Sequence, residues 1–290
     1  MFQGFESKTV VADGVAINLV QGGVGPPVLL LHGYPQTHAM WHAVAPILAQ
    51  HFTVVAPDLR GYGDSAKPET DEGHLAYSKR ASAGDQATIM TALGFEKFAL
   101  VGHDRGGRVA HRLALDFPDR VQRLALIDIV PTYNAFAETD KEKAMSYYHW
   151  FFLSQPFDLP ERLIGVDPIY FLHWCLKSWG TGDLDYFAPD ALAEYERCFV
   201  DPAVIHGSCE DYRASATIDL EHDTEDLERK IACPTLALWG NRLEKWYDDV
   251  SEIWRNRADN VTGGGLNGGH FLPEEMPEEI ARALFFFLRV

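Results

Sequence analysis

A glycine-rich segment from Gly102 to Gly107, with the sequence GHDRGG, contains the residue best suited to covalent chemistry. It directly follows an apolar run and opens a helical pattern. This is the context of the sharp G-x-S-x-G turn that exposes a catalytic serine, here with Asp104 in the serine's place. Serine attacks acyl carbon, whereas a carboxylate can displace a leaving group from an alkyl carbon and become an ester. We therefore predict that Asp104 is the nucleophile of an enzyme.

Hydrolysis of such an ester requires a general base, and a late histidine fits that role. In chains with this turn the nucleophile comes first, then an acid, then the histidine. His270 lies between a weak final strand pattern and a C-terminal helical pattern. No carboxylate follows the apolar run that ends at Trp239, because Asn241 and Arg242 stand there. Asp128 instead ends the preceding apolar run, where a carboxylate needs a partner. We predict that Asp128 orients His270 and stabilises its imidazolium.

The backbone N–H groups of Arg105 and Tyr34 are expected to form an oxyanion hole.

Two arginines beside the nucleophile indicate the class of substrate. The side chains of Arg105 and Arg108 fall in the first turn of the helix, where the helix dipole disfavours cations. Two guanidinium groups at that place are explained if the substrate brings its own carboxylate, held bidentately. The sequence therefore predicts a small anionic substrate.

These residues need a scaffold that brings distant segments together, and the hydropathy pattern predicts an α/β fold. Continuous apolar runs are typical of strands that a parallel sheet buries on both faces. Helical patterns between them predict a doubly wound, mostly parallel sheet, with ligands at the carboxyl ends of the strands. The runs are Val28–Leu31, Phe52–Ala56, Phe98–Val101, Leu124–Ile127 and Thr235–Trp239, and the helical patterns include Ala43–Gln50, Ala83–Leu93 and Arg108–Asp116.

The alternation of strands and helices stops between residues 131 and 225. That stretch is rich in Tyr, Trp, Phe and His and indicates several helices. Strand character resumes near Pro234. We expect one core, formed by residues 1–130 and 226–290, that carries an inserted helical cap formed by residues 131–225.

Composition limits the partners and the location of the chain. Its 290 residues are 47% hydrophobic and 23% charged, a globular mixture, and the formal net charge is −17. So acidic a chain is not expected to bind nucleic acid or an anionic membrane, and an anionic substrate needs local cations. The four cysteines form no metal pattern, and we find no signal peptide or apolar stretch of membrane-spanning length. We expect a cytoplasmic enzyme without a metal or an organic cofactor.

Three segments, HGYPQ, DLRGYGDS and GHDRGGR, together with Asp128 and His270, closely resemble the fluoroacetate dehalogenases of the α/β-hydrolase superfamily. The resemblance runs through nearly the whole chain. It implies an α/β-hydrolase fold and the hydrolysis of short 2-haloacids, such as haloacetate and fluoroacetate, to glycolate and halide. It also implies SN2 attack by Asp104, a covalent ester intermediate, a water activated by His270, and a carboxylate clamp formed by Arg105 and Arg108.

The resemblance further implies that three cap residues, His149, Trp150 and Tyr212, hydrogen-bond the departing halide. We call these three residues the halide cradle. Each side chain combines an apolar body with an N–H or O–H donor, so together they could solvate a small anion in a dry pocket. Without the resemblance, the aromatic run from Tyr147 to Phe152 is also typical of a packed cap core. Family members are commonly homodimers, which implies a homodimer here.

Some features leave alternatives open. The chain departs from the family pattern in residues 241–249 and in the glycine-rich residues 261–267, so the pocket rim and the preferred halide stay open. An epoxide hydrolase shares the aspartate nucleophile, and Tyr148 and Tyr212 could protonate an epoxide oxygen. Epoxide hydrolases and haloalkane dehalogenases usually carry Trp after the nucleophile, so Arg105 speaks against both. A non-catalytic receptor with this fold would not need the complete Asp/Asp/His set.

Overall fold

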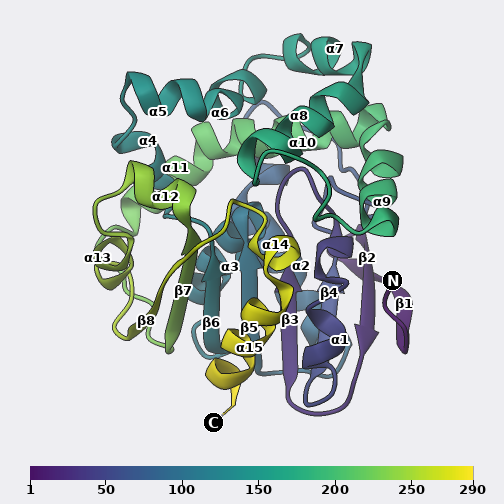
Figure 1. Ribbon diagram of the computed structural model, residues 1–290, viewed down its shortest axis with the longest axis vertical. Helices are drawn as coiled ribbons and strands as arrows, with labels where there is room; N and C mark the ends of the chain where they lie inside the picture. The colour runs from purple at the N-terminus through teal and green to yellow at the C-terminus, as the bar shows by residue number, and fades with distance from the viewer. Residues whose placement is uncertain (290) are drawn as a thin grey trace.

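An eight-stranded sheet crosses the centre of the computed structural model, which describes residues 1–289 (Figure 1). The strands are β1 (Phe5–Ala12), β2 (Val15–Gly22), β3 (Pro27–Leu31), β4 (Thr53–Pro57), β5 (Phe98–His103), β6 (Val121–Ile127), β7 (Thr235–Gly240) and β8 (Val261–Leu266). Their order across the sheet is β1-β2-β4-β3-β5-β6-β7-β8. β2 is antiparallel to both of its neighbours, and the other pairs are parallel. The predicted α/β-hydrolase fold with a mostly parallel sheet is confirmed.

The five apolar runs correspond to the central strands β3 to β7. β5 and β7 are buried along their whole length, as expected for strands covered on both faces. β1 and β2 were not predicted. β1 lies at one edge, and most of its residues are half-buried or exposed, so it has no continuous apolar run. β8, the weak final strand, forms the other edge and is also only partly buried.

Helices cover both faces of this sheet. α3 (Asp104–Asp116) lies behind it in Figure 1, and α1 (Ala45–Leu48) and α15 (Pro277–Leu288) lie in front. α2 and α3 begin before the predicted ranges, because the Ser78 side chain caps α2 and α3 starts at the turn residue itself. The other helices outside residues 132–225 are η1 (His38–Trp41), η2 (Leu75–Tyr77), α2 (Lys79–Ala92), α12 (Asn241–Trp246), α13 (Val250–Arg255) and α14 (Leu272–Glu275).

The helices of residues 132–225 lie together above the carboxyl ends of the parallel strands (Figure 1). They are α4 (Thr132–Ala137), α5 (Lys141–Ser146), α6 (Tyr148–Leu153), α7 (Leu159–Val166), α8 (Pro168–Trp179), α9 (Pro189–Phe199), α10 (Pro202–Ala216) and α11 (Ile218–Glu225). We call these residues the cap. In this position the cap covers the edge of the sheet at which Asp104 and Asp128 lie.

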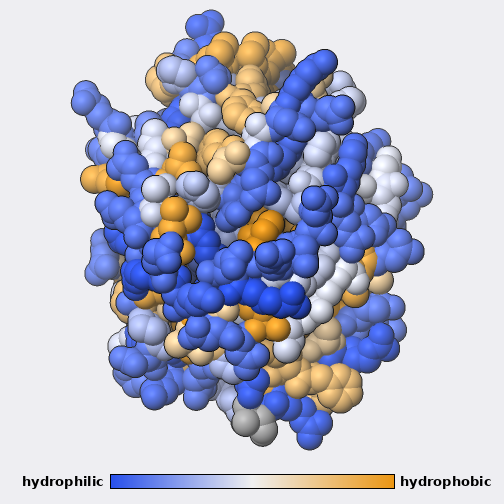
Figure 2. All heavy atoms as spheres, turned by 90° about the vertical axis from the view of Figure 1, so that its left-hand side faces the viewer, coloured by the Kyte–Doolittle hydropathy of each residue, from blue (hydrophilic) through white to orange (hydrophobic). Residues whose placement is uncertain are grey.

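The outer surface reflects the acidic composition. Figure 2 shows the side of the molecule that carries α4, α5, α12 and α13, which is mostly hydrophilic with hydrophobic atoms in small scattered groups. Among the described residues, no helix combines the length and the apolar character that crossing a membrane requires.

One buried carboxylate, Asp211 of α10, joins the cap to the core. Its Oδ2 accepts hydrogen bonds from the Tyr62 hydroxyl at 2.7 Å and from Arg105 Nε at 2.6 Å, and its Oδ1 pairs with Lys79 Nζ. Asp219 of α11 accepts the backbone N–H of Lys79 at 2.7 Å. Because Arg105 and Lys79 are both buried, each needs a nearby counter-charge. Asp211 therefore holds α10 against α2 and α3.

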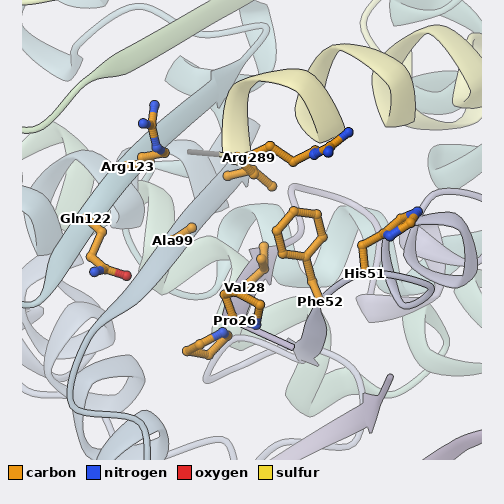
Figure 3. A pocket seen from close by; sticks show the side chains of 10 residues that line it. Pro26, Val28, His51, Phe52, Ala99, Gln122, Arg123 and Arg289 are labelled. Carbon is orange, nitrogen blue, oxygen red and sulfur yellow. The ribbon is translucent and has the colours of Figure 1, made fainter. Parts of the chain in front are cut away.

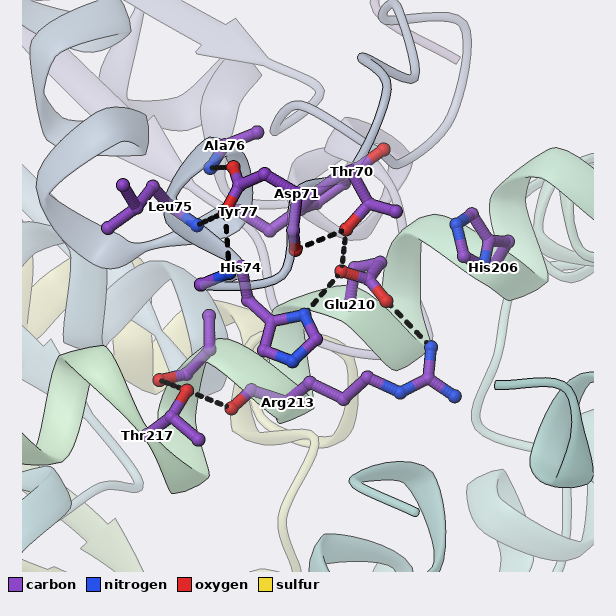
Figure 4. A network of polar contacts seen from close by, with 12 residues as sticks. Thr70, Asp71, His74, Leu75, Ala76, Tyr77, His206, Glu210, Arg213 and Thr217 are labelled. Atoms are coloured by element: carbon purple, nitrogen blue, oxygen red, sulfur yellow. Dashed lines mark hydrogen bonds and ion pairs between the residues drawn. The ribbon is translucent and has the colours of Figure 1, made fainter. Parts of the chain in front are cut away.

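The preceding residue, Glu210, ties α10 to the loop that follows β4 (Figure 4). Its Oε2 lies 2.7 Å from His74 Nδ1 and also accepts the Thr70 hydroxyl, and its Oε1 pairs with Arg213 at 2.7 Å. Arg213 pairs in turn with Glu161 of α7 at 2.6 Å. Two adjacent carboxylates thus attach one cap helix through separate sets of contacts.

We expect Asp211→Asn to lower the free energy of unfolding by about 3 kcal/mol, because it leaves buried Arg105 without its carboxylate partner and Lys79 with only Asp219 Oδ2, at 3.4 Å. Burial alone would raise the pKa of Asp211, but Arg105 and Lys79 outweigh it and hold the pKa below its ordinary value. The carboxylate therefore contributes stability above about pH 4 that is lost as the pH falls. The difference between wild type and variant, measured by denaturant unfolding, should shrink on acidification.

Asp64→Asn is the matched control for that measurement. Asp64 pairs with Arg197 at 2.8 Å, but the two side chains are 55% and 52% exposed. Exposed pairs of this kind contribute about 0–1 kcal/mol. If Asp211→Asn cost no more than this control at neutral pH, Asp211 would not attach the cap to the core.

Candidate active site

The predicted nucleophile lies at a tight turn between β5 and α3. Asp104 has a φ of +45°, which is unusual for a residue with a side chain. A Cβ on Gly102 would lie 2.4 Å from the carbonyl oxygen of Gly106, and one on Gly106 would lie 2.3 Å from that of His32. Only glycine fits at these two places. The turn thus holds the Asp104 side chain in a strained conformation at the carboxyl edge of the sheet, as in a nucleophile elbow.

Asp104 is buried and charged. Burial alone would raise its pKa, but His270 and then Arg105 outweigh burial and lower the pKa of Asp104 to about 2. Its Oδ1 accepts the backbone N–H of Tyr34 at 2.9 Å. Its Oδ2 lies 3.8 Å from His270 Nε2. The N–H that was predicted for the oxyanion hole therefore already holds one carboxylate oxygen, while the other faces the histidine.

His270 is oriented by Asp128. His270 Nδ1 lies 2.5 Å from Asp128 Oδ2, and Asp128 Oδ1 accepts the backbone N–H of Gly240 at 2.8 Å. Because an ionised carboxylate only accepts hydrogen bonds, we assign a proton to Nδ1, and Nε2 faces Asp104. His103 lies behind, with its Nε2 2.7 Å from the carbonyl oxygen of His270. The structure brings together the three residues that were predicted to form the triad.

Arg105 uses most of its hydrogen-bonding groups within the protein. Its Nε and one terminal nitrogen donate to the side chain and the backbone carbonyl of Asp211, at 2.6 and 2.8 Å, and the latter nitrogen also donates to Ser215. Its guanidinium carbon lies 4.2 Å from the centre of the Tyr212 ring. The other terminal nitrogen, Nη1, is buried without a partner among the described residues. Arg105 can therefore offer a ligand one nitrogen.

Arg108, one turn further along α3, has no carboxylate within ion-pair distance in residues 1–289. Its Nη1 donates to the carbonyl oxygen of Val130, and its guanidinium carbon lies 4.6 Å from the centre of the Trp150 ring. Its Nε is buried without a partner among the same residues. Burial and the charge of Arg105 lower the pKa of Arg108, yet an arginine stays protonated in proteins. Its charge is available to an anionic ligand.

The three residues of the halide cradle lie together. His149 and Trp150 belong to α6 and Tyr212 to α10. The Tyr212 ring centre is 5.8 Å from that of His149 and 5.7 Å from that of Trp150, both with edge-on packing. Burial, and after it the charge of Arg242, lower the pKa of His149 well below its ordinary value. His149 is therefore neutral, with one N–H donor on its ring.

The catalytic residues line a cavity of about 20 Å³. A volume of this size holds about one water molecule, so the closed site suits only a small substrate. Arg105 and Tyr212 are not part of its wall and pack behind it. The lining residues are Asp104, Arg108, Asp128, Val130, Ala135, Tyr147, His149, Trp150, Trp179, Arg242, Leu243, Tyr247 and His270.

Several of these wall residues were not predicted to belong to the site. The ring centre of Trp179, at the end of α8, is 4.1 Å from that of His149. The Tyr247 hydroxyl accepts a hydrogen bond from buried Lys143 at 2.5 Å. Arg242 stands directly after β7, a position that was noted only because it lacks a carboxylate. The position of Arg242 just after a strand could have predicted that it lies in the site, because the carboxyl ends of the strands meet there. No local sequence pattern indicated Trp179 or Tyr247.

A larger cavity, of about 640 Å³, lies at the opposite end of the sheet (Figure 3). Its wall includes Pro26, Val28, Phe52 and Arg289, near the amino ends of β3 and β4. Ligands of open α/β sheets bind at the carboxyl ends of the strands, and none of the predicted site residues reaches this cavity. We therefore assign the chemistry to the small cavity under the cap.

Comparison with known proteins agrees with the fold described above and identifies relatives that are enzymes. Residues 26–260 match the family model described as alpha/beta hydrolase fold. The chain is 50% identical to fluoroacetate dehalogenase from Burkholderia sp over 99% of its length and 95% of the relative's. It is 37% identical to a soluble epoxide hydrolase from Corynebacterium sp. (strain C12), over 95% of its length and 94% of the relative's.

Solved structures agree. A crystal structure from Nostoc sp PCC 7120, described as that of an alpha/beta hydrolase, superposes with a TM-score of 0.97 and 58% sequence identity, covering 99% of both chains. The match to the family model and the near full-length identity to a dehalogenase determine the family. This chain is an enzyme of the alpha/beta hydrolase family and belongs, within it, to the haloacetate dehalogenases.

Proposed function

We propose that this enzyme hydrolyses short 2-haloacids, such as fluoroacetate and chloroacetate, to glycolate and halide. The observation that carries the proposal is a small cavity that places a charged Asp104 beside His270 and beside Arg108, whose charge no carboxylate pairs within residues 1–289. A carboxylate nucleophile suits attack on an alkyl carbon, and an arginine suits a substrate carboxylate. The fluoroacetate dehalogenase relative supports the same substrate class.

The first step is displacement at carbon. Asp104 Oδ2, which faces the cavity and His270, attacks the carbon that carries the halogen. The new C–O bond forms as the carbon–halogen bond breaks, and the halide leaves with the bonding electron pair. Asp104 Oδ1 stays hydrogen-bonded to the N–H of Tyr34 and becomes the carbonyl oxygen of the ester. The product of this step is a covalent ester between Asp104 and the acid.

The second step hydrolyses that ester. His270 Nε2 removes a proton from a water molecule, whose oxygen attacks the carbonyl carbon of Asp104. Negative charge develops on Oδ1, where the N–H of Tyr34 and the predicted N–H of Arg105 stabilise it. Asp128 stabilises the imidazolium that forms. As the tetrahedral intermediate collapses, its bond to the glycolate oxygen breaks, His270 returns its proton to that oxygen, and Asp104 is restored as a carboxylate with release of one proton. Water is the only co-reactant.

We expect His270→Asn to stop the reaction after the first step, because Asn cannot take the proton from water. Intact mass spectrometry of the variant after treatment with chloroacetate should show enzyme plus one carboxymethyl group, on Asp104. The control variant His51→Asn, at an exposed position outside the site, should turn over without accumulating an adduct. One turnover of wild type in heavy-oxygen water should label Asp104. Label in glycolate with none in the enzyme would instead identify water as the nucleophile.

The substrate carboxylate is the group that Arg108 binds in this proposal, with the unpaired Nη1 of Arg105 behind the cavity wall. Arg108→Lys keeps the charge but removes the planar pair of donors. We expect it to reduce kcat/KM for chloroacetate roughly ten- to hundredfold, as for a lost charged hydrogen bond. Arg105→Lys should also reduce it, but that change breaks the contacts with Asp211 as well, so Arg108→Lys is the cleaner variant. Exposed Arg162→Lys is the control.

Chloroacetamide tests the same clamp from the side of the substrate. It keeps the carbon–chlorine bond and lacks the negative charge. Wild type should turn it over poorly, and Arg108→Lys should change that rate little. Comparable rates for chloroacetamide and chloroacetate in the wild type would show that the arginines do not bind the carboxylate.

The halide cradle is the part of the proposal that concerns the leaving group. Fluoride is the smallest halide, and its departure depends most on preorganised donors. Trp150→Phe keeps the ring and removes one N–H, so defluorination should fall more than dechlorination, and Tyr212→Phe should show a smaller effect of the same sign. Trp41→Phe, at a buried position outside the cavity, is the control for packing. Equal losses for fluoroacetate and chloroacetate in Trp150→Phe would assign these aromatic residues to cap packing.

Epoxide hydrolysis is the alternative function, since an epoxide hydrolase is also a relative. It requires a cap tyrosine beside the nucleophile. Tyr148 and Tyr212 lie outside the cavity wall, but Tyr147 is part of it, so an assay must separate the two activities. Halide release from haloacetate, compared with diol formation from styrene oxide, distinguishes the two activities.

The predicted cytoplasmic location and homodimer remain part of the proposal, and sedimentation analysis tests the dimer.

A further inference from the structure

Arg242 reaches the catalytic cavity from α12, the helix that follows β7. It is the second residue of α12, two positions after Gly240, whose N–H binds Asp128. Its side chain lines the same cavity as Asp104 and His270. It is only half-buried, whereas Arg105 and Arg108 are buried, so it is the cavity arginine that is most accessible from solvent.

The contacts of Arg242 hold its side chain in place but do not neutralise it. One terminal nitrogen donates to the carbonyl oxygen of Ser146 at 3.2 Å, and the guanidinium carbon lies 4.7 Å from the Tyr147 ring centre and 5.7 Å from that of Trp179. Both rings are part of the cavity wall. Among residues 1–289, no carboxylate lies within ion-pair distance of this guanidinium.

The charge of Arg242 matters because the enzyme repels its own substrate at long range. The chain carries a formal net charge of −17, and the cavity itself contains the carboxylates of Asp104 and Asp128. A haloacid is an anion, so its approach is unfavourable unless a local cation offsets this field. Arg105 is paired with Asp211 and Arg108 lies deeper. The cation that an approaching anion meets first is therefore Arg242.

We propose that Arg242 is a substrate-capture residue, which draws the carboxylate of the substrate into the cavity before Arg108 holds it. The identity of the substrate rests on the function proposed above, but the capture of a small carboxylate does not. Arg242 acts on association and takes no part in the displacement or in ester hydrolysis. The effect therefore appears in KM and in salt dependence rather than in kcat.

The competing explanation is that Arg242 only ties α12 to the cap through Ser146 and the two rings. Three variants separate the explanations. Arg242→Gln removes the charge, Arg242→Lys keeps it without the planar group, and Arg162→Gln removes one charge from a cap side chain that is 79% exposed. If Arg242 is only a structural tie, both Arg242→Gln and Arg242→Lys remove the guanidinium contacts, and the resulting loss of binding is the same at all salt concentrations. Electrostatic capture depends on charge and is screened by salt.

Acetate, which cannot react, is the first probe, with binding measured by calorimetry. At an ionic strength of about 10 mM we expect Arg242→Gln to bind acetate roughly three- to thirtyfold more weakly than wild type, Arg242→Lys within about twofold, and Arg162→Gln unchanged. At about 1 M salt the difference should nearly vanish. Capture is contradicted by equal binding of acetate at low salt, by a deficit that persists at high salt, or by no detectable binding to the wild type.

Chloroacetate turnover is the second readout. Arg242→Gln should lower kcat/KM by a similar factor through KM, with kcat within about twofold of wild type, and the loss should be relieved by salt. A wild type that binds acetate but releases no halide would overturn the proposed function and leave substrate capture supported. Halide release with unaltered KM in Arg242→Gln would overturn capture and leave the function supported.

Discussion

The carboxylate of Asp211 is the contact on which the arrangement of this site depends. It is a cap residue, yet its partners Arg105, Lys79 and Tyr62 belong to the core. Arg105 would be buried without a carboxylate partner if Asp211 were absent, and Lys79 would keep only Asp219, because the attraction to a nearby carboxylate offsets the cost of removing each cation from water. The next residue, Tyr212, stacks on the same Arg105 guanidinium. One ion pair thereby positions the nucleophile's neighbour, the back of the halide cradle and the cap helix together.

The site also shows how an acidic enzyme can handle an anion. Arg105, Arg108 and Arg242 surround the cavity, but they are compensated differently. Arg105 is neutralised by Asp211, while Arg108 and Arg242 have only backbone carbonyl and aromatic partners in residues 1–289. Such partners hold the guanidinium group in one position but do not cancel its positive charge. Two arginines without a carboxylate partner therefore line the cavity of a chain whose formal net charge is −17, and the face of the molecule drawn in Figure 2 is mostly hydrophilic.

The sequence allowed prediction of the features that local pattern encodes. Strands buried on both faces appear as apolar runs, so β3 to β7 were predicted, while the edge strand β1 and its neighbour β2 were not. Asp104 was visible because the turn around it requires glycine, and Asp128 because a carboxylate at the end of an apolar run needs a partner. Trp179, Tyr247 and the pairing of Asp211 with Arg105 and Lys79 were not predicted. Each depends on contacts between the cap and the core, which no spacing along the chain indicates.

The size of the cavity has a consequence for halide preference that is separate from hydrogen bonding. About 20 Å³ is the free space of roughly one water molecule, so a bound haloacid would lie in close contact with the cavity walls. Much of the wall is aromatic, and the cap helix above it is fixed by Asp211 and Glu210, so the wall resists displacement. The work of expansion grows with the radius of the halogen. If the substrate is the haloacid proposed above, a stiff wall would favour fluorine over chlorine or bromine by size alone, and softening the cap would widen the range of accepted halogens.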